Sequence, residues 1–124
     1  MRHAILVLVI AIAAVLLGSR ACSTGGESGS WTISMTEMRF SPNRIDAKVG
    51  QPLTIRLVNQ GAQRHDLAFQ ALHMPSLSGV ETALEPGQST TITLRFDEPG
   101  THTFICTIPG HFAAGMSGAV FVRE

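Results

Sequence analysis

The chain has 124 residues, of which 44% are hydrophobic and 15% charged, and its nine basic and nine acidic side chains give a formal net charge of zero. This length suits one packed domain and excludes a large multidomain enzyme, because domains typically hold about 100–150 residues. Without a basic surplus or a run of basic residues the chain offers no surface for phosphate groups, so we expect no nucleic-acid partner.

The first segment has the layout of a secretory signal. Arg2 and His3 precede fourteen uncharged apolar residues, 4–17, and small residues follow. A basic start, a short apolar stretch and small residues are typical of a signal peptide. Fourteen residues are short for a membrane span, which needs about 20. We therefore expect residues 1–21 to be a signal peptide, with an uncleaved anchor as the weaker alternative.

Two routes of processing stay open at the end of this segment. Ser19 and Ala21 fit the small-x-small cleavage site of a simply secreted protein. Cys22, followed by the Gly/Ser-rich residues 23–30, resembles the acylated first residue and tether of a bacterial lipoprotein, although Ser19 replaces the usual leucine. Such a tether is flexible, and double acylation anchors a protein stably. We favour a lipid on Cys22, residues 22–30 as a tether, and a periplasmic or extracytoplasmic, membrane-tethered protein.

From residue 31 onwards the hydrophobic pattern changes to an alternation of apolar and polar residues. In 53–58 and 91–96 the alternation predicts strands with one buried face. Turn residues separate further expected strands at 32–38, 45–49, 66–70, 101–106 and 117–122, with 72–84 as the one long excursion. Seven to eight short strands favour an all-β Greek-key β-sandwich for residues 31–124.

The most informative stretch contains Cys106, His111 and Met116, which recur at five-residue intervals. A thiolate, an imidazole and a thioether, joined by one more imidazole, make the trigonal His₂Cys set with a weak axial Met that serves copper electron transfer. Because this stretch connects two expected strands, its loop can direct the three side chains to one point. His65 opens a strand directly after a polar turn and is the candidate for the second imidazole.

Together these segments resemble a cupredoxin, the small blue-copper fold of auracyanin, rusticyanin, azurin and plastocyanin. The resemblance covers residues 31–124 and implies one type 1 copper, with His65, Cys106 and His111 as strong ligands and Met116 as the axial ligand. The Cys-x4-His-x4-Met spacing is more similar to auracyanin and rusticyanin than to plastocyanin or azurin. The matching segments are 40–42, 49–50, 59–66, 100–106, 109–111 and 115–116.

The resemblance implies a protein that shuttles single electrons and is not an enzyme. No Gly-rich phosphate loop, Ser-His-Asp set or His-x-His pair for further coppers occurs in the sequence. Asp66 follows His65, but adjacent residues of a strand point to opposite faces, so the two are not expected to form an acid–base pair. An extracytoplasmic copper storage or delivery protein with the same ligands is the alternative function, and a metal-free sandwich is the least favoured.

We expect redox proteins to dock around an exposed edge of His111, beside Phe112, and the chain to be a monomer. A modest apolar patch of this kind suits a brief encounter.

Three other residues have simpler explanations than copper binding. His102 stands four residues before Cys106, which is about 13 Å along a strand at about 3.3 Å per residue, too far to share one metal ion. His73 and Met74 are expected to be solvated in the long loop. A disulfide between Cys22 and Cys106 is the weaker reading, because it would consume the cysteine that stands among the ligand candidates.

Overall fold

The structure, a computed structural model, describes residues 29–70 and 81–124. The predicted signal peptide, most of the tether, and His73 and Met74 lie outside these residues. The described part contains no helix that is long and apolar enough to cross a membrane. Its eight strands are β1 (Ser30–Thr36), β2 (Arg39–Ser41), β3 (Arg44–Lys48), β4 (Leu53–Asn59), β5 (Ala68–Phe69), β6 (Ser89–Leu94), β7 (Gly100–Ile105) and β8 (Ser117–Arg123).

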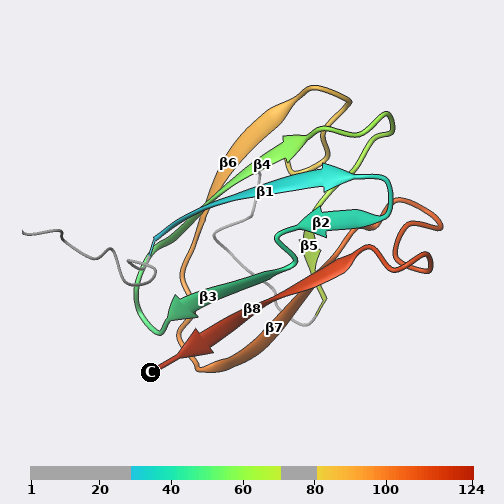
Figure 1. The fold of residues 1–124 in the computed structure, drawn as a ribbon. Helices are drawn as coiled ribbons and strands as arrows, with labels where there is room; N and C mark the ends of the chain where they lie inside the picture. Colours follow the sequence, from blue (N-terminus) through green and yellow to red (C-terminus); the bar gives the residue numbers. More distant parts are fainter. Residues whose placement is uncertain (1–28, 71–80) are drawn as a thin grey trace, which may run out of the picture.

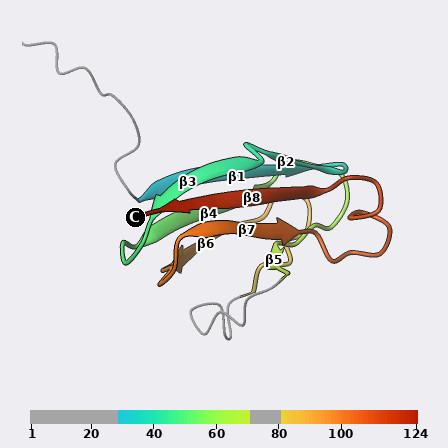
Figure 2. The same cartoon turned by 90° about the horizontal axis from the view of Figure 1, so that it is seen from below.

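The strands form two four-stranded sheets that pack against each other (Figures 1 and 2). One sheet has the order β2-β1-β4-β6 and the other the order β3-β8-β7-β5. The pairs β1/β4 and β3/β8 are parallel, and the remaining neighbours are antiparallel. Because the chain changes sheet after β2, β3, β4, β5 and β6, each sheet combines strands that are distant in sequence. The predicted all-β sandwich is confirmed.

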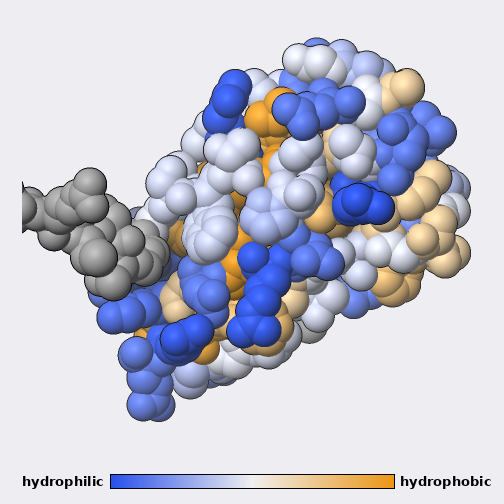
Figure 3. All heavy atoms as spheres, viewed as in Figure 1, coloured by the Kyte–Doolittle hydropathy of each residue, from blue (hydrophilic) through white to orange (hydrophobic). Residues whose placement is uncertain are grey.

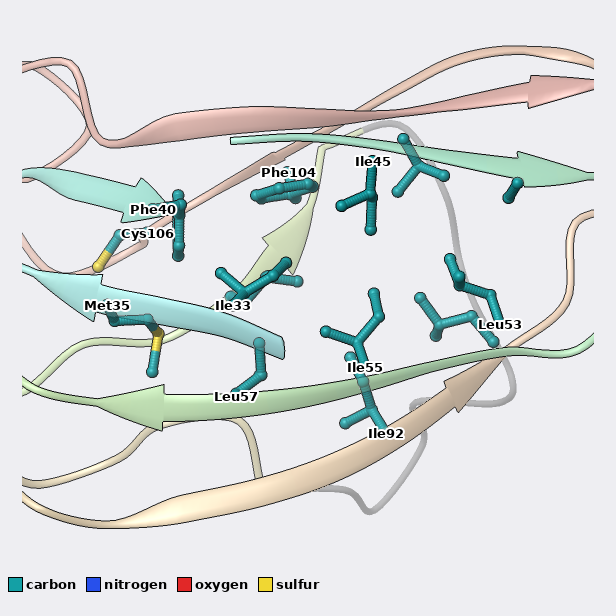
Figure 4. Close-up of a cluster of buried hydrophobic side chains, with 14 of the residues drawn as sticks. Ile33, Met35, Phe40, Ile45, Leu53, Ile55, Leu57, Ile92, Phe104 and Cys106 are labelled. Atoms are coloured by element: carbon teal, nitrogen blue, oxygen red, sulfur yellow. The ribbon is translucent and has the colours of Figure 1, made fainter. Parts of the chain in front are cut away.

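The core lies between the sheets and follows the alternation of the sequence. Leu53, Ile55 and Leu57 are at most 1% exposed, whereas Arg56 points to solvent. Each such side chain stabilises the fold by about 1.5–3 kcal/mol through its removal from water. Figure 4 shows Cys106 at one end of this cluster. The predicted metal ligand is therefore attached directly to the packed core.

Three connections meet at the end of the sandwich opposite the C-terminus (Figures 1 and 2). They are the β1–β2 turn, the β4–β5 connection and the β7–β8 loop. Strands β1 and β4 are parallel neighbours and therefore end on the same side of the molecule. Figure 2 shows β7 ending there as well. This end combines the segments that carry the predicted ligands.

The expected strands are present, most with ends shifted by one or two residues, and two of them differ more. The expected strand 32–38 is observed as β1, which begins at Ser30 and ends at Thr36, and a separate β2, which was not expected, begins at Arg39. Met38, in the turn between them, has φ = 60°, a conformation that side chains rarely adopt and that no pattern of hydrophobicity reveals. The expected strand 66–70 shortens to Ala68–Phe69.

Candidate metal centre

Three of the four predicted ligands converge where the connections meet. His65 lies between β4 and β5, Cys106 directly follows β7, and His111 lies in the loop that leads to β8. Their side chains are buried, with exposed fractions of 0%, 0% and 4%. Cys106 forms no disulfide within residues 29–70 and 81–124, and Cys22, the partner in the alternative disulfide, lies outside them.

The donor atoms of these three residues are close enough to share one ion. The Nδ1 atoms of His65 and His111 are 3.1 Å apart, and Cys106 Sγ lies 3.5 Å from His111 Nδ1. All three residues offer donor atoms within 4.8 Å of one another. Three donors at about 2.1 Å from a common centre in their plane would be about 3.6 Å apart. The residues present therefore fit a trigonal His₂Cys copper site.

The backbone of Met116 is hydrogen-bonded to two of these ligand residues within the β7–β8 loop. Its carbonyl accepts the Cys106 N–H at 3.2 Å, and its N–H donates to the His111 carbonyl at 3.0 Å. The side chain is fully buried. Gly110 and Gly115, with φ values of 86° and 102°, allow the two reversals that fold the loop back. The loop thus ties the backbone of Met116 to those of Cys106 and His111, and the role of Met116 as an axial ligand stays a prediction.

Asn59 holds the segment that leads to His65. Its side chain is fully buried, and Nδ2 donates to the carbonyls of Gln63 and Leu84, both at 2.8 Å. Asn59 Oδ1 accepts the Gly61 N–H at 2.9 Å. His65 itself exchanges two backbone hydrogen bonds with Leu84, at 3.1 and 2.8 Å. The chain after β4 is therefore fixed by one buried amide, and the position of the His65 ring depends on it.

Asp66 connects the two ligand-bearing segments. Its Oδ1 accepts the Thr107 N–H at 2.6 Å, and its Oδ2 accepts the Thr107 hydroxyl. Because Asp66 follows His65 and Thr107 follows Cys106, these bonds hold the two ligands at a fixed separation. The carboxylate is thus engaged by the opposite loop and not by the His65 ring.

The second nitrogen of His111 faces a neighbouring side chain. His111 Nε2 lies 3.1 Å from Gln63 Oε1, and the ring is only 4% exposed. The sequence predicted an exposed ring edge, but the exposed residue Gln63 lies against the imidazole. Phe112, by contrast, is 48% exposed. Gln63 therefore lies against His111, and Phe112, the next residue, is the large exposed apolar side chain of this loop.

Burial sets the protonation states of the metal-free site. It lowers the pKa of His65, and the neighbouring His111 adds to this shift. Burial also raises the pKa of the Cys106 thiol. At neutral pH the His65 imidazole is neutral, with a lone pair available for a metal ion, and the thiol carries its proton. Metal binding would therefore release a proton from Cys106.

The lowered pKa of His65 predicts a stability that depends on pH. The folded chain resists protonation of this residue, so below the ordinary value of 6.5 the unfolded chain binds more protons and the stability falls. Urea unfolding of the metal-free chain between about pH 5 and about pH 8 measures this decrease. A His65→Phe variant should show a smaller dependence on pH, and equal slopes for the two proteins would contradict the prediction.

Comparison with known proteins agrees with this geometry. A family model described as a cupredoxin-like domain matches residues 7–117, a range that contains all four predicted ligands. The chain is a cupredoxin. Copper is the metal of this family, and the His65, Cys106 and His111 cluster supplies the donor atoms that copper prefers.

Several proteins of known identity resemble this cupredoxin. It is 32% identical to the copper-resistant cuproprotein CopI of Rubrivivax gelatinosus over 100 residues, which are 69% of this chain and 61% of that protein. It is 49% identical to auracyanin-B of Chloroflexus aurantiacus over 39 residues, or 32% and 17% of the two chains. The crystal structure of reduced auracyanin from Roseiflexus castenholzii superimposes with a TM-score of 0.67 at 25% identity, covering 81% of this chain and 100% of that one. The chain spans about three fifths of the length of the CopI relative.

His102 lies outside the donor cluster of this cupredoxin, as the sequence predicted, and packs against Phe96 with ring centroids 4.6 Å apart. Two other residues near the site were not predicted. Glu37 and Gln63, which lie close to the ligand rings, carry no sequence signal, because polar residues in surface turns are common.

Proposed function

We propose that this cupredoxin is an electron carrier that binds one copper ion through His65, Cys106 and His111, with Met116 as the axial ligand. The convergence of two imidazole nitrogens and one thiol sulfur within 4.8 Å is the observation that carries the proposal. Bound copper would supply one-electron redox chemistry, with the axial ligand and the surroundings of the sulfur setting its potential. The similarity to auracyanin supports this assignment.

The chain's own contribution is a rigid arrangement of donors. Asn59 fixes the His65 segment, and Asp66 fixes that segment to the loop of Cys106. Burial of the donor atoms excludes water from the sulfur. A site whose donors are held in place in this way has little to rearrange when an electron moves. We propose no enzymatic reaction for the chain alone.

We also propose that redox partners dock on the end of the sandwich around Phe112. This side chain is 48% exposed, and the loop 107–116 contains no charged residue. Figure 3 shows apolar character at the end of the molecule where this loop lies. An apolar patch without charges suits short-lived encounters between redox proteins.

The docking surface predicts a slower electron exchange in a Phe112→Glu variant. A charge in an apolar contact is expected to cost about 1.4 kcal/mol or more, which is about tenfold in rate. NMR line broadening in mixtures of the oxidised and reduced protein measures electron self-exchange between two copies, so no other partner is needed. A Thr101→Glu variant, with the same charge on an exposed residue of β7, is the control. An unchanged visible spectrum with unchanged self-exchange in Phe112→Glu would contradict the docking surface.

The alternative function is extracytoplasmic copper storage or delivery with the same ligands. The 32% identity to a copper-resistant cuproprotein favours it. The two functions differ in how firmly the metal is held. An electron carrier keeps its copper against a competing chelator through repeated redox cycles, and a delivery protein transfers it. Copper retention after several cycles with ascorbate and ferricyanide decides between them, and early loss to the chelator would favour delivery.

We further propose that the protein is exported and tethered through Cys22, with residues 1–21 removed as a signal peptide. The sequence pattern of residues 2–30 supports this proposal. Mass spectrometry of the native amino terminus tests it, because a diacylated Cys22 and a simply cleaved chain differ in mass.

A further inference from the structure

The Nε2 atoms of the two ligand imidazoles, His65 and His111, differ in their contacts. His111 Nε2 lies 3.1 Å from Gln63 Oε1. His65 Nε2 is buried without a hydrogen-bond partner, and it is the single buried side-chain nitrogen or oxygen of this kind in residues 29–70 and 81–124. A carboxylate oxygen of Glu37 lies 3.8 Å from it. A buried polar atom without a partner is costly, so the group beside it matters for the site.

The same carboxylate also holds the segment that leads to His65. Glu37 follows β1, and its Oε1 accepts the backbone N–H groups of Ala62 at 2.5 Å and Gln63 at 3.1 Å. These bonds, chiefly that from Ala62, lower the pKa of Glu37, so the group is negatively charged at neutral pH. The Glu37 carboxylate therefore lies beside the His65 ring and is linked to the His111 ring through hydrogen bonds of Gln63.

We infer that Glu37 is a positioning residue of the metal centre: it orients His65 with Nδ1 toward Cys106 and His111, and it places Gln63 against the second ring. The inference rests on the proposed copper site. A ligand histidine almost always donates its other N–H to a carboxylate, a carbonyl or water, which fixes the tautomer and the ring orientation. The Glu37 carboxylate, 3.8 Å from Nε2, is the charged group on that side of His65.

The backbone around Glu37 is built for this close approach. A side chain at Gly61 would place its Cβ 2.6 Å from Glu37 Oε1 and 3.0 Å from His65 Nε2. Only a residue without a side chain leaves the carboxylate and the imidazole next to each other. The negative charge near the site also favours the more positive, oxidised state of a bound ion. Glu37 is therefore expected to lower the midpoint potential as well as to orient the ring.

Two variants of Glu37 separate its roles. In Glu37→Gln the amide oxygen can still accept the backbone N–H groups of Ala62 and Gln63 and lie beside His65 Nε2, so we expect the copper spectrum of the wild type and a higher midpoint potential. In Glu37→Ala the acceptor is lost, so we expect altered copper hyperfine splitting and release of copper to a chelator several times faster. Glu98→Gln is the matched control, since β7 separates this exposed residue from the site by about 20 Å at about 3.3 Å per residue.

The tautomer of His65 gives a readout that needs no copper. In the metal-free full chain we expect ¹⁵N NMR to find the His65 proton on Nε2 in the wild type and in Glu37→Gln. In Glu37→Ala this preference should weaken. Should Glu37→Ala keep the tautomer, the spectrum and the copper release of the wild type, the positioning role would be overturned.

The potential tests the role of the charge. A Glu37→Gln potential equal to that of Glu98→Gln would overturn the electrostatic part of the inference. Failure of the proposed copper site can be told apart from failure of the Glu37 inference. If the wild-type chain shows no copper spectrum, the copper site is wrong, and the tautomer of His65 in the metal-free chain still tests the role of Glu37.

Discussion

The Cys106→Ser variant is expected to lose the thiolate-to-copper(II) absorption completely and to bind copper(I) more than about 100-fold more weakly. Loss of an outer-shell partner of a metal ligand alone costs about 10–100-fold in affinity, and here a strong ligand itself is removed. Cys106 supplies the one thiol of the donor cluster. Serine has nearly the same size, so the fully buried position still accommodates it and the sandwich should fold.

Absorption spectroscopy and chelator competition measure this effect. Cys22→Ser is the matched control, because Cys22 is the other cysteine of the chain and is predicted to belong to the tether. We expect this control to keep both the colour and the affinity. A coloured Cys106→Ser protein, or a colourless Cys22→Ser protein, would show that the thiolate ligand has been misassigned.

Replacing Asn59 with alanine is expected to lower the free energy of unfolding by about 2–4 kcal/mol, because it leaves buried hydrogen-bonding groups without partners. The amide of Asn59 donates to the carbonyls of Gln63 and Leu84 and accepts the N–H of Gly61. His65 lies between Gln63 and Leu84 in sequence and pairs with Leu84. The same change should therefore weaken copper retention.

Urea unfolding of the metal-free chain checks the stability, and chelator competition checks the site. Asn43→Ala is the control, since Asn43 is exposed and a surface change is expected to stay within about 0.5 kcal/mol. If Asn59→Ala were as stable as this control, the buried amide would not be the feature that fixes the segment before His65.

The sequence predicted the parts of the fold that repeat a simple period. Leu53, Ile55 and Leu57 alternate with polar residues, and the structure buries them as expected. The stretch from Cys106 to Met116 was predicted to direct its ligand side chains to one point, and the distance of 3.5 Å between Cys106 Sγ and His111 Nδ1 agrees with this for two of them. Local patterns of this kind depend on the geometry of one strand or one loop.

The remaining details depend on contacts between segments that are distant in sequence. Strand β5 is short, and next to it the Asp66 side chain bonds to Thr107, 41 residues away. The burial of His111 depends on Gln63, 48 residues away. Glu37 lies beside the His65 ring, and it belongs to the β1–β2 turn, which has an unusual φ angle at Met38. No pattern within one segment encodes these contacts.

The most direct measurement of the central claim is the visible and paramagnetic-resonance spectrum of the full chain loaded with copper(II). We predict one copper per chain, an intense visible absorption from the Cys106 thiolate, and the small copper hyperfine splitting of a trigonal His₂Cys site. A colourless protein, or a spectrum of ordinary tetragonal copper(II), would mean that His65, Cys106 and His111 do not bind one copper ion together.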